Sequence, residues 1–575
     1  MVSLAEFLAA TQADDLRPLS FRTGTPAALP KELRPIWKQL KEPDVVSIDA
    51  GLAKLSDLVS ADPVQADLLL TEVGVDVSDG SLILGNRFQR AATYANNDAN
   101  EHLHYALLGV LSRSAPGSRG ARLRQAVRQL EPSCPSLPEL RGFESLVQLD
   151  LTENTGGSLA GRFGPLPALR TLRLRGSSSI RTLEGLEAPQ LREIDVSCIG
   201  LTDLRALAGK ACIQILNLSG NRKLTDLTPL QACLPTLKSL HLYGTGIANL
   251  SPLSGAGVLE ELDLDDCNSI TSLQGLENVT ISGRQFSLGN LNGLSSLQHL
   301  QAGNLTLSSL KLLTTLEGLE SRAAEIRSLT IWETPGLTDL SALAQLSSLE
   351  ELELNTCKAF TGLKPLEGLT TLRSLALREC PKLKRLPDLS ATSLEDLSLE
   401  DCGISDLGVL PASLSGSLDL VSLKKLKSLT GLERCSGLRQ ISIGHAIEDA
   451  SALAACNEIA ITVDLRHANG NAIPEPLIET LAGLPQVRLR VEDSQYNYYS
   501  GLSLDNPQAL ARIPHLRTLD LSGCSLEDLL FVVGLAELEE LKIEPRSELS
   551  RKLGGCTFEG RGKVAKLQLQ LLGMT

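Results

Sequence analysis

The side chains that can do chemistry are few and scattered in this chain of 575 residues, which holds twelve cysteines and seven histidines. There is no Gly-x-x-x-x-Gly-Lys-Ser/Thr phosphate loop, no His-Glu-x-x-His zinc helix and no Gly-x-Ser-x-Gly nucleophile turn. We therefore expect no enzymatic activity, no bound metal and no cofactor.

Two short patterns imitate chemical sites. His102-x-His104 has the spacing of two metal ligands on a strand, but the flanking sequence predicts a helix and no third ligand lies nearby. Gly560-Arg-Gly-Lys-Val-Ala565 matches the loose dinucleotide-binding pattern, yet no clear strand precedes it and only ten residues follow. We interpret both matches as chance.

Charge and composition restrict the partner and the compartment. The chain carries 54 Lys and Arg against 68 Asp and Glu, a net charge of −14, which disfavours a nucleic-acid backbone and suits a basic or neutral partner. The first ten residues lack a basic residue before their apolar stretch, unlike a signal peptide. No apolar run approaches the ~20 residues of a membrane span, and no Cys-x-x-Cys pair occurs. We expect a cytoplasmic protein that binds neither membrane nor nucleic acid.

One short unit recurs along most of the chain. The 119 leucines, roughly twice the usual share, align as Leu-x-x-Leu-x-Leu-x-x-(Asn/Cys/Thr), as in Leu259–Cys267 and Leu349–Cys357. A second half, Leu-Thr-Asp-Leu, follows at Leu224 and Leu337. Eighteen repeat starts are predicted, at Leu146, Leu169, Leu191, Ile213, Leu237, Leu259, Leu276, Leu297, Ile326, Leu349, Leu372, Leu394, Ser415, Leu438, Ala460, Leu484, Leu516 and Leu538.

These copies resemble the leucine-rich repeat family, in the subclass of roughly 22-residue repeats shared by internalin-like and phosphatase-regulator-like proteins. The resemblance implies an α/β solenoid, a curved leucine-rich repeat with a parallel strand ladder on its concave face. One unit cannot bury its own leucines, so neighbouring units must stack. In the family the ninth position is buried and bonds the backbone; here it is Asn221, Thr245, Cys267, Thr334, Cys357, Cys380, Cys402 and Cys524, which predicts a ladder of buried thiols.

The sequence predicts three parts. Residues 1–140 lack the repeat and form a mostly helical N-terminal domain and cap, in which Val75 to Leu84 alternates like a hairpin turning at Asp79-Gly80. Residues 141–546 form the solenoid of about eighteen repeats, and residues 547–575 a C-terminal cap made of a final strand or a short helix. The N-terminal part either only covers the first open strand edge or has a second docking function.

The third, fifth and seventh residues of each repeat are the candidates for recognition, because the family places them on the concave face between buried leucines. Aromatic residues there neighbour acids, and exposed Tyr and Trp are typical interface anchors. Over successive repeats these three positions form columns of side chains. We expect the columns to bind a basic segment of a partner protein. The alternative is that the acidic residues only form a solvated surface. The predicted partner-binding residues of the columns are Tyr243, Asp263, Asp265, Trp332, Glu351 and Glu353.

Outside the columns, Tyr496, Tyr498 and Tyr499 lie in an extra loop that either contacts a partner or folds back on a neighbouring repeat. Arginines mark the two ends of the columns, with Arg173 and Arg175 near the start and Arg466, Arg488 and Arg490 near the end. The predicted function is non-enzymatic protein–protein recognition or scaffolding. The alternatives are a regulatory subunit of an enzyme complex, and an enzyme whose activity lies in residues 1–140 and whose repeats are a targeting arm.

Overall fold

The computed structural model describes residues 30–41, 45–83, 98–131, 138–152, 159–177, 180–456, 459–465, 472–492, 502–545 and 547–573. They belong to two compact units. The first comprises Met1–Ile270 and Gln274–Gly283, and the second comprises Thr271–Leu273 and Arg284–Thr575.

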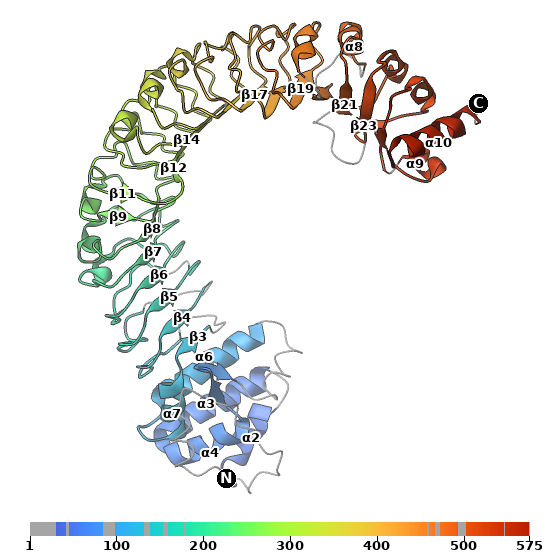
Figure 1. Cartoon of the computed structure of the whole chain (residues 1–575). Coiled ribbons are helices and arrows are strands. Elements are labelled where there is room, and N and C mark those ends of the chain that lie inside the picture. The colour runs from blue at the N-terminus through green and yellow to red at the C-terminus, as the bar shows by residue number, and fades with distance from the viewer. Residues whose placement is uncertain are drawn as a thin grey trace. The chain divides into compact units, whose positions relative to one another are not determined.

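Helices open the first unit (Figure 1). They are α2 (Arg34–Lys41), α3 (Val45–Ala61), α4 (Pro63–Val73), α6 (Asp98–Arg113) and α7 (Arg119–Ala126). α3 packs against α2, α4 and α6, around leucines such as Leu55 and Leu108 that are 1% exposed or less. Arg124 ties α7 to the end of α6, because its Nη1 donates to the carbonyls of Leu111, Ser112 and Ser114 at 2.7, 3.0 and 3.3 Å. Carbonyls at the end of a helix lack the usual intrahelical partners, and Arg124 supplies hydrogen bonds to them.

A hairpin joins these helices to the repeats. β1 (Asp76–Ser78) and β2 (Ser81–Ile83) pair antiparallel, and Asp79 and Gly80 turn between them with φ of 50° and 78°. The predicted hairpin is therefore confirmed. β2 in turn pairs parallel with β3 (Gln129–Leu130), the first strand of the ladder. The hairpin thus covers a strand edge that would otherwise be open.

The ladder of the first unit continues in parallel. From β3 each strand pairs with the next, and the described residues form a nine-stranded sheet with the hairpin at its start. The further strands are β4 (Gln148–Asp150), β5 (Thr171–Arg173), β6 (Glu193–Asp195), β7 (Ile215–Asn217), β8 (Ser239–His241) and β10 (Glu261–Asp263), beside the separate pair β9 (Val258–Leu259) and β11 (Thr280–Ile281). The returning segments hold the 3₁₀ helices η1 (Arg205–Leu207), η2 (Thr228–Ala232) and η3 (Ser251–Leu253).

The second unit repeats the plan with longer strands. Its main described sheet has thirteen strands, parallel except for the last, in the order of the chain. They are β12 (Phe286–Gly289), β13 (Leu305–Ser308), β14 (Ser328–Trp332), β15 (Glu351–Asn355), β16 (Ser374–Arg378), β17 (Asp396–Glu400), β18 (Ser417–Leu420), β19 (Gln440–Gly444), β20 (Ala460–Asp464), β21 (Val487–Glu492), β23 (Leu516–Leu521), β25 (Glu540–Ile543) and β26 (Thr557–Glu559).

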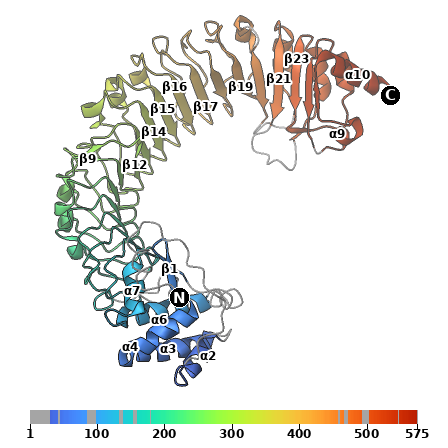
Figure 2. The same ribbon diagram turned by 60° about the horizontal axis from the view of Figure 1, so that its bottom comes forward.

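The remaining elements of the second unit lie in the returning segments and at its end. They are η4 (Leu319–Arg322), η5 (Ser341–Gln345), η6 (Lys364–Leu366), η7 (Ser451–Ala455), η8 (Pro507–Arg512), η9 (Leu530–Gly534), α8 (Glu475–Ala482), α9 (Glu548–Leu553), α10 (Arg561–Leu572) and the small sheet of β22 (Leu502–Ser503) and β24 (Cys524–Ser525). The ladder and the returning segments form opposite sides of this unit, and the ladder lies on the inner side of its bend (Figure 2). The predicted α/β solenoid with a preceding helical region is confirmed.

The repeat pattern follows from which side chains are buried and which ones start the returning turns. The fourth and sixth positions of a repeat, such as Leu352 and Leu354, point into the core and are 2% and 0% exposed. The aspartate of Leu-Thr-Asp-Leu starts the returning turn, because its Oδ1 accepts a hydrogen bond from the backbone N–H two residues later. The distance is 2.8 Å both from Thr228 to Asp226 and from Ser341 to Asp339. Short polar side chains are favoured at such turn starts for this reason.

The ninth position is buried and bonds the backbone, as expected. Asn221 accepts from the N–H of Leu201 and donates to the carbonyls of Val196 and Leu218, at 2.7 to 2.9 Å. The thiol of Cys402 reaches the carbonyl of Leu377 at 3.3 Å. The predicted thiol ladder is confirmed, since Cys267, Cys357, Cys380, Cys402 and Cys524 are buried and unoxidised.

Four predicted repeat starts are wrong in register. Strand pairing places Phe286 and Leu305 opposite one another and Leu305 opposite Leu329, so these repeats begin at Gly283 and Ala302 and not at Leu276 and Leu297. The leucines of that region recur every three residues and imitate the start of the pattern.

Farther along, Ile441 pairs with Ile461 and Ile461 with Leu489. The starts predicted at Ala460 and Leu484 are therefore two residues off. A two-residue shift leaves each side chain on the same face of a strand, so Arg488 and Arg490 still lie on the exposed face of β21, whereas Arg466 becomes a ninth residue and lies outside the described residues. The start predicted at Ser415 is confirmed, because Leu418 pairs with Ile441.

The last described elements also correct one expectation. β26 directly precedes the Gly560 to Ala565 stretch, so the statement that no strand does so was wrong. β26 runs antiparallel to β25, however, whereas a dinucleotide-binding turn follows a parallel strand. α10 then packs on η9, where Gln568 Nε2 donates to the carbonyls of Val532 and Leu535. The boundaries at residues 140 and 546 stay predictions.

Candidate functional site

Tyr243 is the exposed aromatic residue on the ladder side of the first unit. It occupies the seventh position of its repeat, immediately beyond β8, and 46% of its surface is exposed. The neighbouring repeat is in the expected register, with Ser239 opposite Glu261 and His241 opposite Asp263. A hydrogen bond to Asp266 raises the pKa of the Tyr243 hydroxyl, and the charges of Asp263 and Asp265 act in the same direction.

Asp263 has a structural task that its sequence position did not reveal. Its Oδ1 accepts the backbone N–H of Asp265 at 3.0 Å, and burial raises the pKa of its carboxyl group. The fifth positions of two earlier repeats form the same turn, from Ser197 to Asp195 and from Ser219 to Asn217, both at 3.0 Å. This carboxylate is therefore directed at its own backbone.

Trp332 is the corresponding exposed aromatic residue of the second unit. It ends β14 at the seventh position, is 44% exposed, and lies between Ser308 and Asn355 of the adjacent strands. The expected pairing of Ser328 with Glu351 and of Thr330 with Glu353 is present. The side chain of Trp332 cannot enter the core, because the alternate residue Ile331 occupies it.

An arginine that sequence reasoning missed neutralises part of the acidic surface around Trp332. Arg378 Nη1 lies 3.4 Å from Glu353, and Arg378 Nε lies 3.7 Å from Glu400. The sequence could have revealed this arginine, because Arg378 is the seventh residue of the repeat that starts at Leu372. Glu351, in contrast, is an exposed carboxylate at the third position of its repeat, where β15 begins.

The structure brings together only some of the predicted residues. Tyr243, Asp263 and Asp265 are neighbours in the first unit, and Trp332, Glu351 and Glu353 are neighbours in the second. Tyr496, Tyr498 and Tyr499 lie outside the described residues, as does Arg466. The arginine end of the first unit is partly neutralised, because Arg173 pairs with Glu193 at 2.7 Å and with Asp150 at 3.8 Å.

The eighth position forms a row along the rim of the ladder that the sequence analysis did not detect. In the first unit it holds Gly220 and Gly244, with φ of 75° and 64°. In the second unit Glu333, Thr356 and Glu379 adopt the same left-handed conformation, with φ of 47°, 55° and 48°. Cys198 and Asp266, with φ of 57° and 60°, occupy the same position in other repeats of the first unit, so the rim of the first unit lacks side chains only at its glycines.

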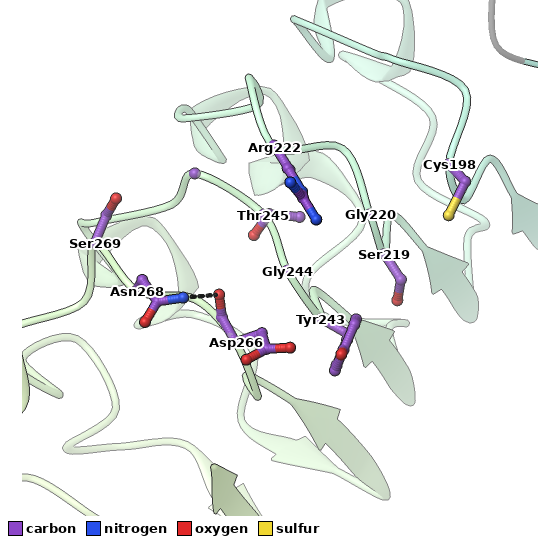
Figure 3. A pocket seen from close by; sticks show the side chains of 11 residues that line it. Cys198, Ser219, Gly220, Arg222, Tyr243, Gly244, Thr245, Asp266, Asn268 and Ser269 are labelled. Carbon is purple, nitrogen blue, oxygen red and sulfur yellow. Dashed lines mark hydrogen bonds between the residues drawn. The ribbon is translucent and has the colours of Figure 1, made fainter. Parts of the chain in front are cut away.

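A groove of about 630 Å³ follows this rim in the first unit. The backbone of Gly220 and Gly244 forms its floor (Figure 3), and Gly246 also lines it. Tyr243 and Asp266 line one part of it and Arg222 another, together with Cys198, Ser219, Thr245, Asn268 and Ser269. The groove thus combines an aromatic ring with both signs of charge.

Comparison with known proteins agrees with the repeat architecture. A family model described as Leucine Rich repeat matches residues 390–411 and 512–529. The chain is thus similar to leucine-rich repeat proteins in these two segments. It is 27% identical over 402 residues to a probable disease resistance protein of Arabidopsis thaliana, and 26% identical over 296 residues to the disease resistance protein RRS1 of the same plant. These matches cover 68% and 43% of this chain but only 20% and 21% of the relatives.

Two solved structures also align with parts of this chain. An internalin, InlF of Listeria monocytogenes, aligns over 75% of this chain and 92% of its own, with 17% identity and a TM-score of 0.28. A complex of TLR13 with a single-stranded RNA aligns over 71% of this chain and 64% of its own, with 19% identity and a TM-score of 0.33. The exclusion of nucleic acid as a partner stays a prediction from charge.

Chemical sites of other kinds were sought in the described part of the chain. No group of three or more His, Cys, Asp or Glu side chains there is arranged to hold a metal ion. None of the described helices is long and apolar enough to cross a membrane. Burial raises the pKa of the Cys357 thiol to about 11, so this thiol is protonated and a poor nucleophile at neutral pH.

Proposed function

We propose that this protein is a recognition protein without enzymatic activity, and that it binds a partner protein on the ladder side of its repeats. One observation supports this most strongly. Tyr243 and Trp332 occupy the same position of their repeats and are 46% and 44% exposed, although alternate residues of the ladder are buried. Amphipathic aromatic side chains of this kind are the usual anchors of protein interfaces.

Charge indicates the chemistry of the partner. The carboxylates of Asp265, Asp266 and Glu351 lie on the same side as the aromatic residues, which favours a basic segment. The leucine-rich repeat class supports recognition in general, and the curated relatives are disease resistance proteins. Reduced thiols throughout the described part of the chain support a cytoplasmic location, which is part of the same proposal.

The test begins with the intact chain as bait in an extract of its own host. A co-purified protein is identified, purified and titrated against the wild-type chain and against Trp332→Ala and Tyr243→Ala. Loss of a buried anchor commonly weakens binding by more than ~2 kcal/mol, so we expect at least a roughly tenfold increase in Kd for one of the two variants.

Leu312→Ala is the matched control, because Leu312 is 55% exposed and lies outside the ladder strands. This variant removes exposed apolar surface of similar extent and should leave the Kd unchanged. Equal affinities for wild type, Trp332→Ala and Tyr243→Ala would contradict recognition on the ladder side. A partner that loses affinity only with Leu312→Ala would place recognition on another side of the repeats.

A further inference from the structure

We infer that the rim groove of the first unit, between Tyr243, Asp266 and Arg222, receives an arginine side chain of the partner together with a carboxylate next to it. This inference rests on the proposed function and specifies where a partner is held and by which chemistry. The groove lies along the ends of the strands and not on the ladder itself, since its residues occupy the seventh to eleventh positions of their repeats.

The groove exists because side chains are missing from its floor. A Cβ at Gly246 would lie 2.6 Å from the carbonyl oxygen of Arg222, so no larger residue fits there without a backbone shift. A Cβ at Gly244 would meet no atom within 4 Å and would project into open space. Glycine at this position therefore keeps the groove open, and the fold itself does not require it.

The Tyr243 end of the groove suits a guanidinium group. The exposed ring offers a face on which a planar cation can stack. Asp266 lies beside it, close enough to hydrogen-bond the Tyr243 hydroxyl, and the charges of Asp263 and Asp265 also raise the pKa of Tyr243. The ring therefore lies in a negative field. Arginine stacks and forms bidentate bonds with carboxylates, whereas lysine is only a point charge.

The other part of the groove has the opposite polarity. The exposed side chain of Arg222 points into it from the turn after Gly220 (Figure 3). Asn268 and Ser269 lie on the Asp266 side, where Asn268 donates to the carbonyl of Asp266. A ligand with a carboxylate near its arginine satisfies both ends, whereas a run of basic residues would meet Arg222 unfavourably. Complementary charges of this kind contribute specificity more than affinity.

The test uses the full-length chain and a phage-displayed library of random heptapeptides. Wild-type protein should enrich peptides that contain arginine with Asp or Glu within a few residues. Gly244→Asn should reduce this enrichment at least tenfold, because its side chain fills the groove. Asp266, which has the same left-handed backbone in the next repeat, shows that a short polar residue is tolerated there. Asp266→Asn should abolish the arginine preference, and Arg222→Gln only the preference for Asp or Glu.

Gly209→Asn is the control for backbone strain. Gly209 also has a positive φ, of 81°, with no atom near its Cβ position, but it does not line the groove, so enrichment should persist. A recovered peptide should also slow alkylation of the exposed Cys198 in the groove several-fold and leave Cys212 unaffected. The inference is overturned by selected peptides without arginine, by equal enrichment of lysine, or by unchanged enrichment with Gly244→Asn.

The two proposals can fail independently. Trp332→Ala should not alter peptide selection by the groove, since Trp332 belongs to the other unit. If the natural partner loses affinity with Trp332→Ala but not with Gly244→Asn, recognition by the ladder stands and the groove assignment is wrong. If the groove selects arginine peptides and neither Trp332→Ala nor Tyr243→Ala affects the natural partner, the ladder proposal fails instead.

Discussion

The eighth position of the repeat is glycine at Gly220 in the first unit and glutamate at Glu333 in the second. Gly220 and Glu333 have φ of 75° and 47°, and in both the backbone N–H donates to the seventh-position carbonyl of the next repeat. The distances are 2.7 Å to Tyr243 and 2.9 Å to Asn355. The same bond is present with glycine and with glutamate, so the contact between repeats imposes the conformation and the residue type does not.

The difference has an energetic and a functional side. The left-handed backbone conformation costs a residue other than glycine roughly 1–2 kcal/mol. Several successive repeats of the second unit have such a residue at the eighth position. In exchange the second unit displays side chains on its rim, where Ser309 and Thr356 bond Glu333 and Glu379 at 3.2 and 3.3 Å. The first unit has glycine at Gly220 and Gly244, where its groove is open, and left-handed Cys198 and Asp266 at the same position of two other repeats.

The largest predicted effect tests whether the two cores are equivalent. Leu264 and Leu354 both occupy the sixth position and are 0% exposed. Replacing either with alanine should destabilise its own region by ~2–5 kcal/mol, because the cavity collapses only partly. Hydrogen exchange of the full-length chain, measured repeat by repeat in denaturant, reports this loss. If only one of the two substitutions lowered the stability of its region, the two cores would differ in packing.

An intermediate effect is expected at the eighth position, with opposite signs in the two units. Gly220→Ala should destabilise by about 1–3 kcal/mol, since the new Cβ would lie 2.5 Å from the Cys198 sulfur in a left-handed backbone. Thr356→Gly should stabilise by up to about 1 kcal/mol, because relief of strain exceeds the added entropy of the unfolded chain. Denaturant unfolding of both variants provides the comparison. A destabilised Thr356→Gly would mean that the rim hydrogen bonds outweigh the strain.

The smallest predicted effect is on the pH dependence of stability, and it should be the same in both units. Hydrogen bonds from Thr228 and Ser341 lower the pKa of Asp226 and Asp339. A pKa that is lowered on folding adds stability above the ordinary Asp value of about 3.9, and this stability is lost as the pH falls through the lowered pKa. Asp226→Asn and Asp339→Asn keep the acceptor and remove the ionisation. Each should flatten the acid limb of a stability–pH curve slightly, and an unchanged limb would contradict these assignments.

Much of the candidate site was readable from the sequence. The seventh-position placement of Tyr243 and Trp332 and their neighbours followed from counting within repeats, and the strand pairing agrees. The pairing of Arg378 with Glu353 and Glu400 was missed, because only a comparison of three successive repeats reveals it. The groove was not predicted, because it forms where glycines leave space open, and a search for sequence motifs does not detect such space.

The sequence alone determined the features that are periodic and local. These are the buried fourth and sixth positions, the polar or thiol ninth position, and the short polar residue, such as Asp226 or Asp339, that starts a returning turn. The tertiary structure decided what depends on the neighbouring repeat. It set the starts at Gly283 and Ala302, where leucines at three-residue spacing imitate the pattern. It also imposed the left-handed eighth position on glutamate and threonine as well as glycine. Hydrogen bonds between repeats fix both features, and their partners lie far apart along the chain, as in the bonds from Phe286 to Asn304 and from Gly220 to Tyr243.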